Sequence, residues 1–319
     1  MNSDDPNRGP LNRRQFNRIC KTLGSSLLAV GAIGLSGASP LDSVTNGPAR
    51  AVKFRDGSLV PAIGQGSWHL GEERHPAASE EEALRTGLSQ GMTLIDTALV
   101  YAGGRSEELI GRVIANQRNR VFLVSKVPPD RATEDGIARA CETSLTRLGT
   151  DHLDLYLLHW RGGANLPGVV ASFEKIRSAG KIGAWGVSNF SVKDMEELFL
   201  VPNGDRCATN QVLYNLGQRD IERDVLPWCR QQKMPVMAYS PLGGPGASLL
   251  RDPTLKRIAA AHGCSAAAVA LAWTIRSGNV IAIPESGSAT HVKDNAVAFS
   301  LKLTAEDLQT LDAAHPPPG

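Results

Sequence analysis

From residue 51 onward, short apolar segments alternate with longer amphipathic segments along the chain. The apolar segments are rich in β-branched residues and do not alternate strictly with polar ones, as is typical of parallel strands buried on both faces. They lie at residues 63–68, 93–95, 121–125, 153–158, 184–187, 209–212, 236–238 and 280–283. Helical patterns between them include residues 80–90, 132–148, 168–179 and 220–232.

Eight strands separated by helices predict an α/β fold of the (β/α)8 TIM barrel type. Two earlier apolar segments, 52–54 and 59–63, flank Asp56-Gly57 and predict an N-terminal β-hairpin, because glycine tolerates the positive φ of a tight turn. A doubly wound sheet would also alternate in this way. However, the turns Gly64-Gln65-Gly66 and Gly103-Gly104 lack the G-x-G-x-x-G spacing of its nucleotide-binding turn. The prediction is therefore one barrel over residues 51–319.

Residues 1–50 differ from the rest of the chain and read as a leader. Arg13-Arg14 precede Phe16, and a weakly apolar run of small residues follows at 23–38, too short for a stable membrane span. This pattern resembles a twin-arginine export signal and implies the twin-arginine export machinery as a partner and a periplasmic location. The alternative is a basic tail with a chance Arg-Arg pair, which would leave the protein in the cytoplasm.

The composition is that of an ordinary globular protein, with 42% hydrophobic and 21% charged residues in a chain of 319. The net charge is +2, of which the leader, with six Lys+Arg and three Asp+Glu, contributes +3, so residues 51–319 sum to −1. A nearly neutral body without a basic cluster gives no electrostatic footprint for nucleic acid. The cysteines lie at 20, 141, 207, 229 and 264 without a CxxC pair, which argues against a disulfide framework or a zinc site.

Nearly every predicted strand ends in polar or small residues that a buried strand would not favour. In chain order these are Gly66-Ser67-Trp68, Asp96, Lys126, His159, Ser188-Asn189, Gln211, Tyr239-Ser240 and Glu285-Ser286. In a barrel of parallel strands all of them converge on the C-terminal rim, where the active sites of this fold lie. The alternative is that they are ordinary strand-terminal residues facing water.

Asp96, Tyr101, Lys126 and His159 form a chemical set among these residues. A lysine or aspartate just beyond a buried strand is costly to desolvate unless it is paired, and Asp96 and Lys126 can pair with each other. A tyrosine beside that ammonium group would have a lowered pKa and could exchange a proton near neutral pH. Such a group is what carbonyl reduction requires.

Several segments in order along the chain resemble the motif series of the aldo-keto reductases. They are Ile95-Asp96-Thr97-Ala98 with Tyr101, Val124-Ser125-Lys126, the segment 153–160, Gly186-Val187-Ser188-Asn189-Phe190 and Ala238-Tyr239-Ser240-Pro241-Leu242. The resemblance runs from about residue 52 to residue 315. The segments 210–214, 226–229 and 234–239 are similar to the bacterial branch that reduces methylglyoxal and other small aldehydes.

The resemblance implies an NAD(P)H-dependent oxidoreductase that reduces aldehydes or ketones to alcohols by hydride transfer. Tyr101 would be the general acid, Lys126 held by Asp96 would depress the pKa of Tyr101, and His159 would orient the substrate oxygen. Trp68 and Trp160 would form walls of the substrate pocket. Further cofactor contacts are implied at Gly66, Ser67, Trp68, Ser188, Asn189, Gln211, Tyr239, Ser240, Leu242, Gly243, Glu285, Ser286, His291, Asp294 and Asn295.

The chain departs from the family pattern after the last strand. The family usually has a lysine where this chain has Glu285 and an arginine where it has His291, and these two cations grip the 2′-phosphate of NADPH. NADP(H) is the cofactor that the family implies, and NAD(H) is an alternative because a carboxylate can accept hydrogen bonds from a ribose 2′-hydroxyl.

Two other functions are consistent with a barrel of this kind. A regulatory or sensor protein could bind the nicotinamide cofactor with little turnover, but it would not need all four of Asp96, Tyr101, Lys126 and His159. A metal-dependent hydrolase would need His and Asp clusters at several strand ends, and only His159 and Asp96 qualify. We therefore expect no metal and take reduction of a small carbonyl compound as the expected activity.

Overall fold

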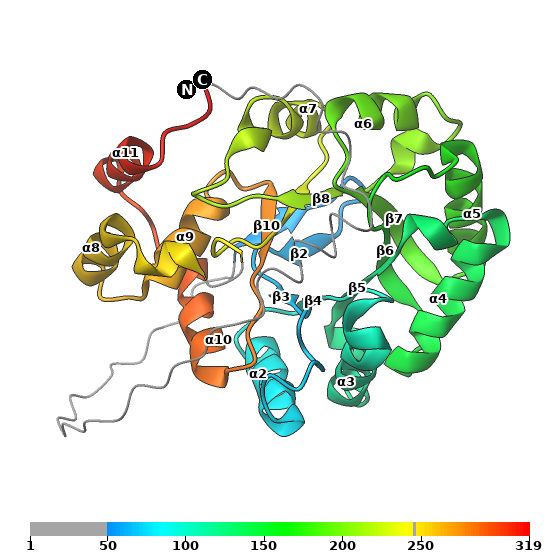
Figure 1. The fold of residues 1–319 in the computed structure, drawn as a ribbon, viewed down its shortest axis with the longest axis horizontal. Coiled ribbons are helices and arrows are strands. Elements are labelled where there is room, and N and C mark those ends of the chain that lie inside the picture. Colours follow the sequence, from blue (N-terminus) through cyan, green and yellow to red (C-terminus); the bar gives the residue numbers. More distant parts are fainter. Residues whose placement is uncertain (1–49, 245–246) are drawn as a thin grey trace, which may run out of the picture.

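A computed structural model describes residues 50–244 and 247–319 of the chain. The predicted twin-arginine leader, apart from Arg50, lies outside the described residues. The order of the described elements is a hairpin followed by repeated strand and helix units, as Figure 1 shows.

The hairpin precedes the barrel and packs against its strands. Strands β1 (Ala51–Lys53) and β2 (Leu59–Pro61) are antiparallel, with Val52 opposite Val60. Gly57 in the turn has a φ of 93°, a conformation that glycine adopts without strain. Val52 and Val60 are fully buried in one cluster with apolar residues of the barrel strands, so the hairpin covers part of the barrel core.

The barrel contains eight parallel strands in sequential order. They are β3 (Gln65–Gly66), β4 (Leu94–Asp96), β5 (Phe122–Val127), β6 (Leu153–Leu158), β7 (Ile182–Ser188), β8 (Asn210–Leu213), β9 (Val236–Tyr239) and β10 (Val280–Ile283). Most of their residues are buried, because the strands face the barrel interior on one side and helices on the other. The (β/α)8 fold and its N-terminal hairpin are thus confirmed.

The first and last strands of the sheet meet and close the barrel. Bridges pair Ile63 with Ala282 and Gly66 with Glu285, and the amide of Gly66 donates to the carbonyl of Pro284 at 2.9 Å. A β-carbon on Gly66 would lie 2.8 Å from the carbonyl oxygen of Ile283, closer than real contacts allow. Glycine at this position therefore permits the close approach of the two strands.

The helices surround the strands as an outer layer (Figure 1). They are α2 (Ala77–Ser89), α3 (Arg105–Ile114), α4 (Glu134–Leu148), α5 (Leu166–Ser178), α6 (Val192–Phe199), α7 (Val225–Gln231), α8 (Pro253–Ala261), α9 (Ala266–Thr274), α10 (Ala289–Ala296) and α11 (Ala305–Ala314). Helix α4 illustrates their local signals: Thr133 caps its first turn and Gly149 ends it in the left-handed conformation.

The helix predicted over residues 220–232 is shorter than expected. A 3₁₀ turn at Asp220–Glu222 comes first, and α7 begins only at Val225, where the side chain of Asp224 accepts from the Val225 amide. Pro227 explains the boundary, because proline has no amide hydrogen and fits only in the first turn of a helix.

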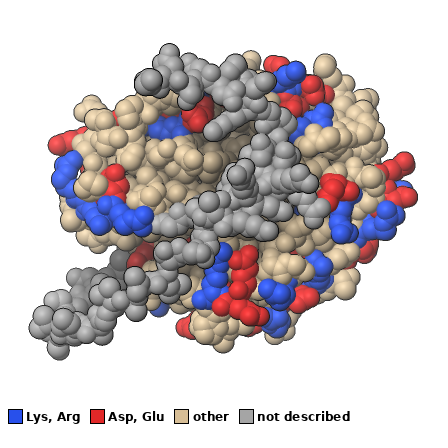
Figure 2. Space-filling view, viewed as in Figure 1, with Lys and Arg blue, Asp and Glu red and all other residues tan. Residues whose placement is uncertain are grey.

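Charged side chains of both signs share the surface, and the described cysteines are free thiols. Acidic and basic side chains lie next to one another along the edge of the barrel in Figure 2. Cys141, Cys207 and Cys229 are buried free thiols and Cys264 is partly buried. Across residues 50–244 and 247–319, none of the helices is both long and apolar enough to cross a bilayer.

Candidate active site

A cavity of about 900 Å³ lies at the C-terminal ends of the barrel strands, and we call it the central cavity. It is lined by residues from seven of the eight strand ends and from the loops that follow them. Most of the residues expected at this rim line it: Gly66, Ser67, Trp68, Asp96, Tyr101, His159, Ser188, Asn189, Gln211, Tyr239, Ser240, Leu242, Gly243 and Glu285. The convergence that parallel strands predict is therefore present in the structure.

Lys126 occupies a fully buried position at the end of β5. Its Nζ donates to Asp96 Oδ1 at 2.5 Å, to the carbonyl of Thr97 at 2.8 Å and to the Tyr101 hydroxyl at 3.3 Å. An ammonium group has three hydrogens, and these three oxygens satisfy them. The side chain is thus fixed, with its charge directed at the phenol.

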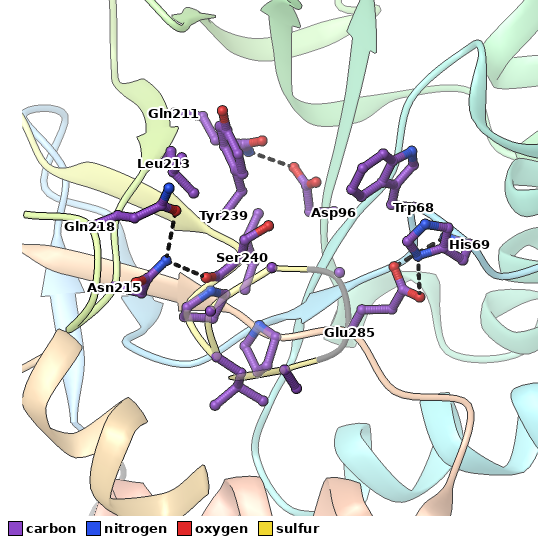
Figure 3. Close-up of a pocket in the computed structure, with 18 of the residues that line it drawn as sticks. Trp68, His69, Asp96, Gln211, Leu213, Asn215, Gln218, Tyr239, Ser240 and Glu285 are labelled. Atoms are coloured by element: carbon purple, nitrogen blue, oxygen red, sulfur yellow. Dashed lines mark hydrogen bonds and ion pairs between the residues drawn. The ribbon is translucent and has the colours of Figure 1, made fainter. Parts of the chain in front are cut away.

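Asp96 links Lys126 to the opposite side of the barrel. Its second oxygen accepts from Gln211 Nε2 at 2.7 Å (Figure 3). Residues of β4, β5 and β8 therefore meet at one carboxylate. Burial raises the pKa of Asp96 and lowers that of Lys126, since desolvation disfavours both charged forms, while their mutual attraction and hydrogen bonds oppose these shifts. The hydrogen bonds of the Asp96 carboxylate and of the Lys126 ammonium all favour the charged forms. The geometry therefore supports an ion pair between the two residues.

Tyr101 stands at the start of a short 3₁₀ turn (Tyr101–Gly104) that follows β4. Ala102 and Gly103 in this turn have φ values of 48° and 67°, left-handed values that interrupt its helical geometry. The Tyr101 ring meets the His159 ring edge-on, with 5.7 Å between centroids. The phenol is consequently placed between an ammonium group and an imidazole at the cavity wall.

His159 follows β6, is buried and lines the central cavity. Burial and the nearby charge of Lys126 hold the pKa of His159 well below its usual range. The imidazole is therefore neutral at physiological pH and has one N–H to donate. A neutral imidazole can hydrogen-bond a substrate oxygen without bringing a second full positive charge to the site.

Asn189 and Ser240 lie directly after β7 and β9, and both have left-handed backbones, with φ values of 59° and 50°. Non-glycine residues in this region are uncommon and gather at functional sites. The Tyr239 hydroxyl donates to Asn189 Oδ1 at 2.9 Å, and Asn189 Nδ2 donates to Ser188 Oγ at 3.0 Å. Ser188, Asn189 and Tyr239 thus form a polar patch with one aromatic face on the cavity wall.

Glu285 is paired, which its sequence position did not reveal. One carboxylate oxygen accepts from the His69 amide at 3.0 Å, and the other lies 3.0 Å from His69 Nδ1. The His69 ring in turn stacks on Trp68, with centroids 4.4 Å apart. In Figure 3 these three side chains lie on one side of Asp96, and Gln211 and Tyr239 lie on the other.

The remaining expected residues lie outside the lining of the central cavity. Trp160 packs with its ring centroid 5.1 Å from that of His159. Beyond Glu285, Ser286 accepts from the Ser288 amide, while His291 is exposed and Asp294 and Asn295 are part of α10.

Several residues of the cavity were not expected from the sequence. Arg74, Asn215 and Gln218 line it from loops, and Asn215 Nδ2 donates to the carbonyl of Ser240 at 3.0 Å. The one available signal was for His69, a polar residue directly after Trp68 at the end of the first strand. No group of three or more metal-ligating side chains occurs within the part of the chain that the structure describes.

The chain is similar in sequence to known reductases. The model of the aldo/keto reductase family matches residues 62–316. Methylglyoxal reductase YeaE of Escherichia coli is 48% identical over 272 residues, which cover 84% of this chain and 96% of that protein. Glyoxal reductase of Bacillus subtilis is 35% identical, covering 82% of this chain and 91% of that protein.

Solved structures are similar to this chain as well. An aldo/keto reductase from Klebsiella pneumoniae, solved in complex with NADP and acetate, is 47% identical with a TM-score of 0.82. The match covers 85% of this chain and 96% of that one. A second structure of an aldo-keto reductase from that organism contains NADPH and matches to the same extent.

Proposed function

The chain belongs to the aldo/keto reductase family and is an NAD(P)H-dependent oxidoreductase that reduces carbonyl groups, and we propose that Tyr101 is its general acid. The observation that carries this proposal is the 3.3 Å contact between Lys126 Nζ and the Tyr101 hydroxyl at the wall of the central cavity. A positive charge at this distance stabilises the phenolate that remains after the proton has left.

The other cavity tyrosine is a poor candidate for the acid. Burial raises the pKa of Tyr239 to about 12, and its hydroxyl already donates to Asn189. Tyr239 is instead suited to present its ring to a flat ligand. Tyr101 therefore remains as the phenol that can lose a proton to the substrate.

The cavity residues fit a nicotinamide cofactor. The amide side chains of Asn189 and Gln211 and the hydroxyl of Ser188 can hold a carboxamide, the ring of Tyr239 can stack on the nicotinamide, and Gly243 permits close approach of a pyrophosphate. When bound, the cofactor supplies the hydride for the carbonyl carbon.

The chain's own residues donate the proton and stabilise the developing negative charge. Tyr101 donates its proton to the carbonyl oxygen, and neutral His159 donates a hydrogen bond to the same oxygen. Lys126 stabilises the resulting phenolate, while Asp96 keeps Lys126 charged and in place. Preorganised donors of this kind each contribute a few kcal/mol to lowering a barrier.

The substrate that we infer is a small aldehyde such as methylglyoxal. Two relatives are named as reductases of methylglyoxal and glyoxal, and the aromatic face of Trp68 selects by shape on one side of the cavity. An aldehyde panel, including methylglyoxal and aromatic aldehydes, can be followed by the loss of reduced-nicotinamide absorbance. Cofactor binding without turnover of any aldehyde would contradict the enzyme and favour the regulatory alternative.

NADP(H) is the proposed cofactor, in line with the ligands of the Klebsiella pneumoniae structures. NAD(H) is the alternative cofactor, because this chain has Glu285 and His291 where the family usually has two cations. Titration with NADPH and NADH separates the two, since a preference of about tenfold corresponds to about 1.4 kcal/mol. Tighter binding of NADH would overturn the NADP(H) assignment.

We further infer that residues 1–50 direct export of the folded barrel (51–319) by the twin-arginine route to the periplasm. The support is the Arg13-Arg14 pair before Phe16 and the mild apolar run after it. Arg13→Lys with Arg14→Lys should leave the protein in the cytoplasmic fraction of cells that otherwise export it. Equal distribution of the two proteins would contradict export by this route.

A further inference from the structure

The central cavity has few charges with which to hold an anionic cofactor. A nicotinamide dinucleotide carries at least two negative charges on its pyrophosphate, and NADPH carries a further phosphate. Among the described residues that line the cavity, Arg74 is the only lysine or arginine, while Asp96 and Glu285 are carboxylates. Arg74 lies in the loop between β3 and α2, which the family resemblance did not single out.

The two cavity carboxylates are engaged by other residues. Asp96 accepts from Lys126 and Gln211, and Glu285 accepts from the His69 amide while its other oxygen faces the His69 ring. Arg74 instead pairs with Glu72 of its own loop, with Nε donating to Oε2 at 3.0 Å. The guanidinium is therefore at the cavity without being bound to the carboxylates of its wall.

The ion pair between Arg74 and Glu72 costs little free energy to break. The Arg74 side chain is 52% exposed, and the two residues are neighbours in one loop. Exposed ion pairs of this type contribute at most about 1 kcal/mol. A phosphate group can accept two parallel hydrogen bonds from a guanidinium, an arrangement with better geometry and more charge than the exposed carboxylate offers.

Packing places the Arg74 loop beside the loop that follows β10. A β-carbon on Gly287 would lie 2.5 Å from Cδ2 of His75, so the His75 ring rests directly on the Gly287 backbone. Gly287 lies two residues after Glu285, and His69 reaches Glu285 from the start of the same β3–α2 loop. Arg74 is thus supported next to the side of the cavity where Glu285 stands in place of a cation.

We propose that Arg74 binds a phosphate group of the nicotinamide dinucleotide and exchanges Glu72 for it. The inference depends on the proposed cofactor binding in the central cavity. In this proposal the β3–α2 loop supplies the positive charge that the loop after β10 lacks. Arg74 is a cofactor-binding residue in this assignment, and it takes no part in the proton transfer.

The test compares Arg74→Gln with Arg85→Gln as a matched control. Arg85 lies on the adjacent helix α2, is 48% exposed and pairs with Glu81, so its replacement removes the same charge without touching the cavity. Dissociation constants for NADPH and NADH are measured by calorimetric titration of the full chain. We expect Arg74→Gln to weaken NADPH binding by about tenfold or more, and Arg85→Gln to change it less than about twofold.

The two cofactors distinguish which phosphate Arg74 contacts. Loss of affinity for NADPH alone assigns Arg74 to the 2′-phosphate, and an equal loss for NADH assigns it to the pyrophosphate. The inference would be overturned if Arg74→Gln and Arg85→Gln bound NADPH with the same affinity as each other and also bound NADH with the same affinity as each other. If the unmodified protein bound neither cofactor, the proposed function itself would fail, and this result is distinct from an effect of Arg74.

Discussion

The Nζ atom of Lys126 lies 3.3 Å from the hydroxyl oxygen of Tyr101, and the same nitrogen is bound to Asp96. The cation beside the Tyr101 hydroxyl is thus held by a carboxylate on the neighbouring strand, and hydrogen bonds within the protein fix all three groups. Preorganisation of this kind avoids the reorganisation that water would need around a developing charge.

Replacement of Tyr101 by phenylalanine should abolish reduction while leaving cofactor binding nearly unchanged. The ring and its contact with His159 remain, and only the proton donor is lost. General acids contribute about 10² to 10⁴-fold, so kcat for methylglyoxal should fall by at least about 100-fold. Steady-state kinetics combined with NADPH titration measures both effects. Retention of most of the turnover would refute the assignment of Tyr101.

Asp96→Asn should destabilise the protein as well as slow it. The substitution preserves the shape of the side chain but leaves the fully buried Lys126 ammonium without its counter-charge. Breaking a buried ion pair by removing one partner typically costs about 3–5 kcal/mol. Urea denaturation at pH 7 measures this loss. A free energy of unfolding within about 1 kcal/mol of the unmodified protein would contradict a charged Lys126 at this position.

His159 should remain neutral well below the pH at which exposed histidines gain a proton. Its pKa is lowered by burial and by the charge of Lys126, so the neutral form persists as the pH falls through about 6.5 and protonation follows only at lower pH. Nitrogen-15 NMR of the histidine rings, with His159→Gln to identify the signal, measures its titration. A His159 ring that titrates at or above about pH 6.5 would contradict a neutral hydrogen-bond donor.

The strand ends explain why part of the site could be predicted from the sequence. Asp96, Lys126 and His159 each lie at the end of an apolar strand or directly after it, and parallel strands in a barrel bring all such positions to one rim. The alternation of apolar and amphipathic segments likewise predicted the barrel, because it reflects burial on two faces. These features depend on local patterns and on one general property of the fold.

The remaining contacts depend on the closed three-dimensional structure. His69 and Glu285 are separated by 216 positions and meet only because β3 and β10 close the barrel. The acceptor that Thr97 offers to Lys126 is a backbone carbonyl, which every residue possesses and which no sequence pattern marks. Arg74 could not be distinguished in sequence from other charged residues of its loop.

The acid stability of the barrel should depend on Glu174, a residue of α5 outside the lining of the central cavity. Its carboxylate accepts from Arg177 and Arg206 at 2.8 Å and from the indole of the buried Trp185 at 2.7 Å. Burial alone would raise the pKa of Glu174, but these hydrogen bonds outweigh it and lower the pKa to about 2. Helix α5 is thereby attached to β7 and to the turn at Gly204–Arg206.

A carboxyl group with a lowered pKa stabilises the folded state above its unfolded pKa, and this contribution disappears as the pH falls toward the folded pKa. For Glu174 the loss should occur between about pH 4.5 and pH 2 and be on the order of 3 kcal/mol. Glu174→Gln should therefore be less stable than the unmodified protein at pH 7, and its stability should decline less between pH 5 and pH 3. Glu197→Gln, which alters an exposed carboxylate paired with Arg161, is the matched control, and its stability should change with pH as that of the unmodified protein does. Urea denaturation at each pH measures the free energy of unfolding of the three proteins. Parallel stability curves for the unmodified protein and Glu174→Gln would show that this carboxylate is not the source of the acid sensitivity.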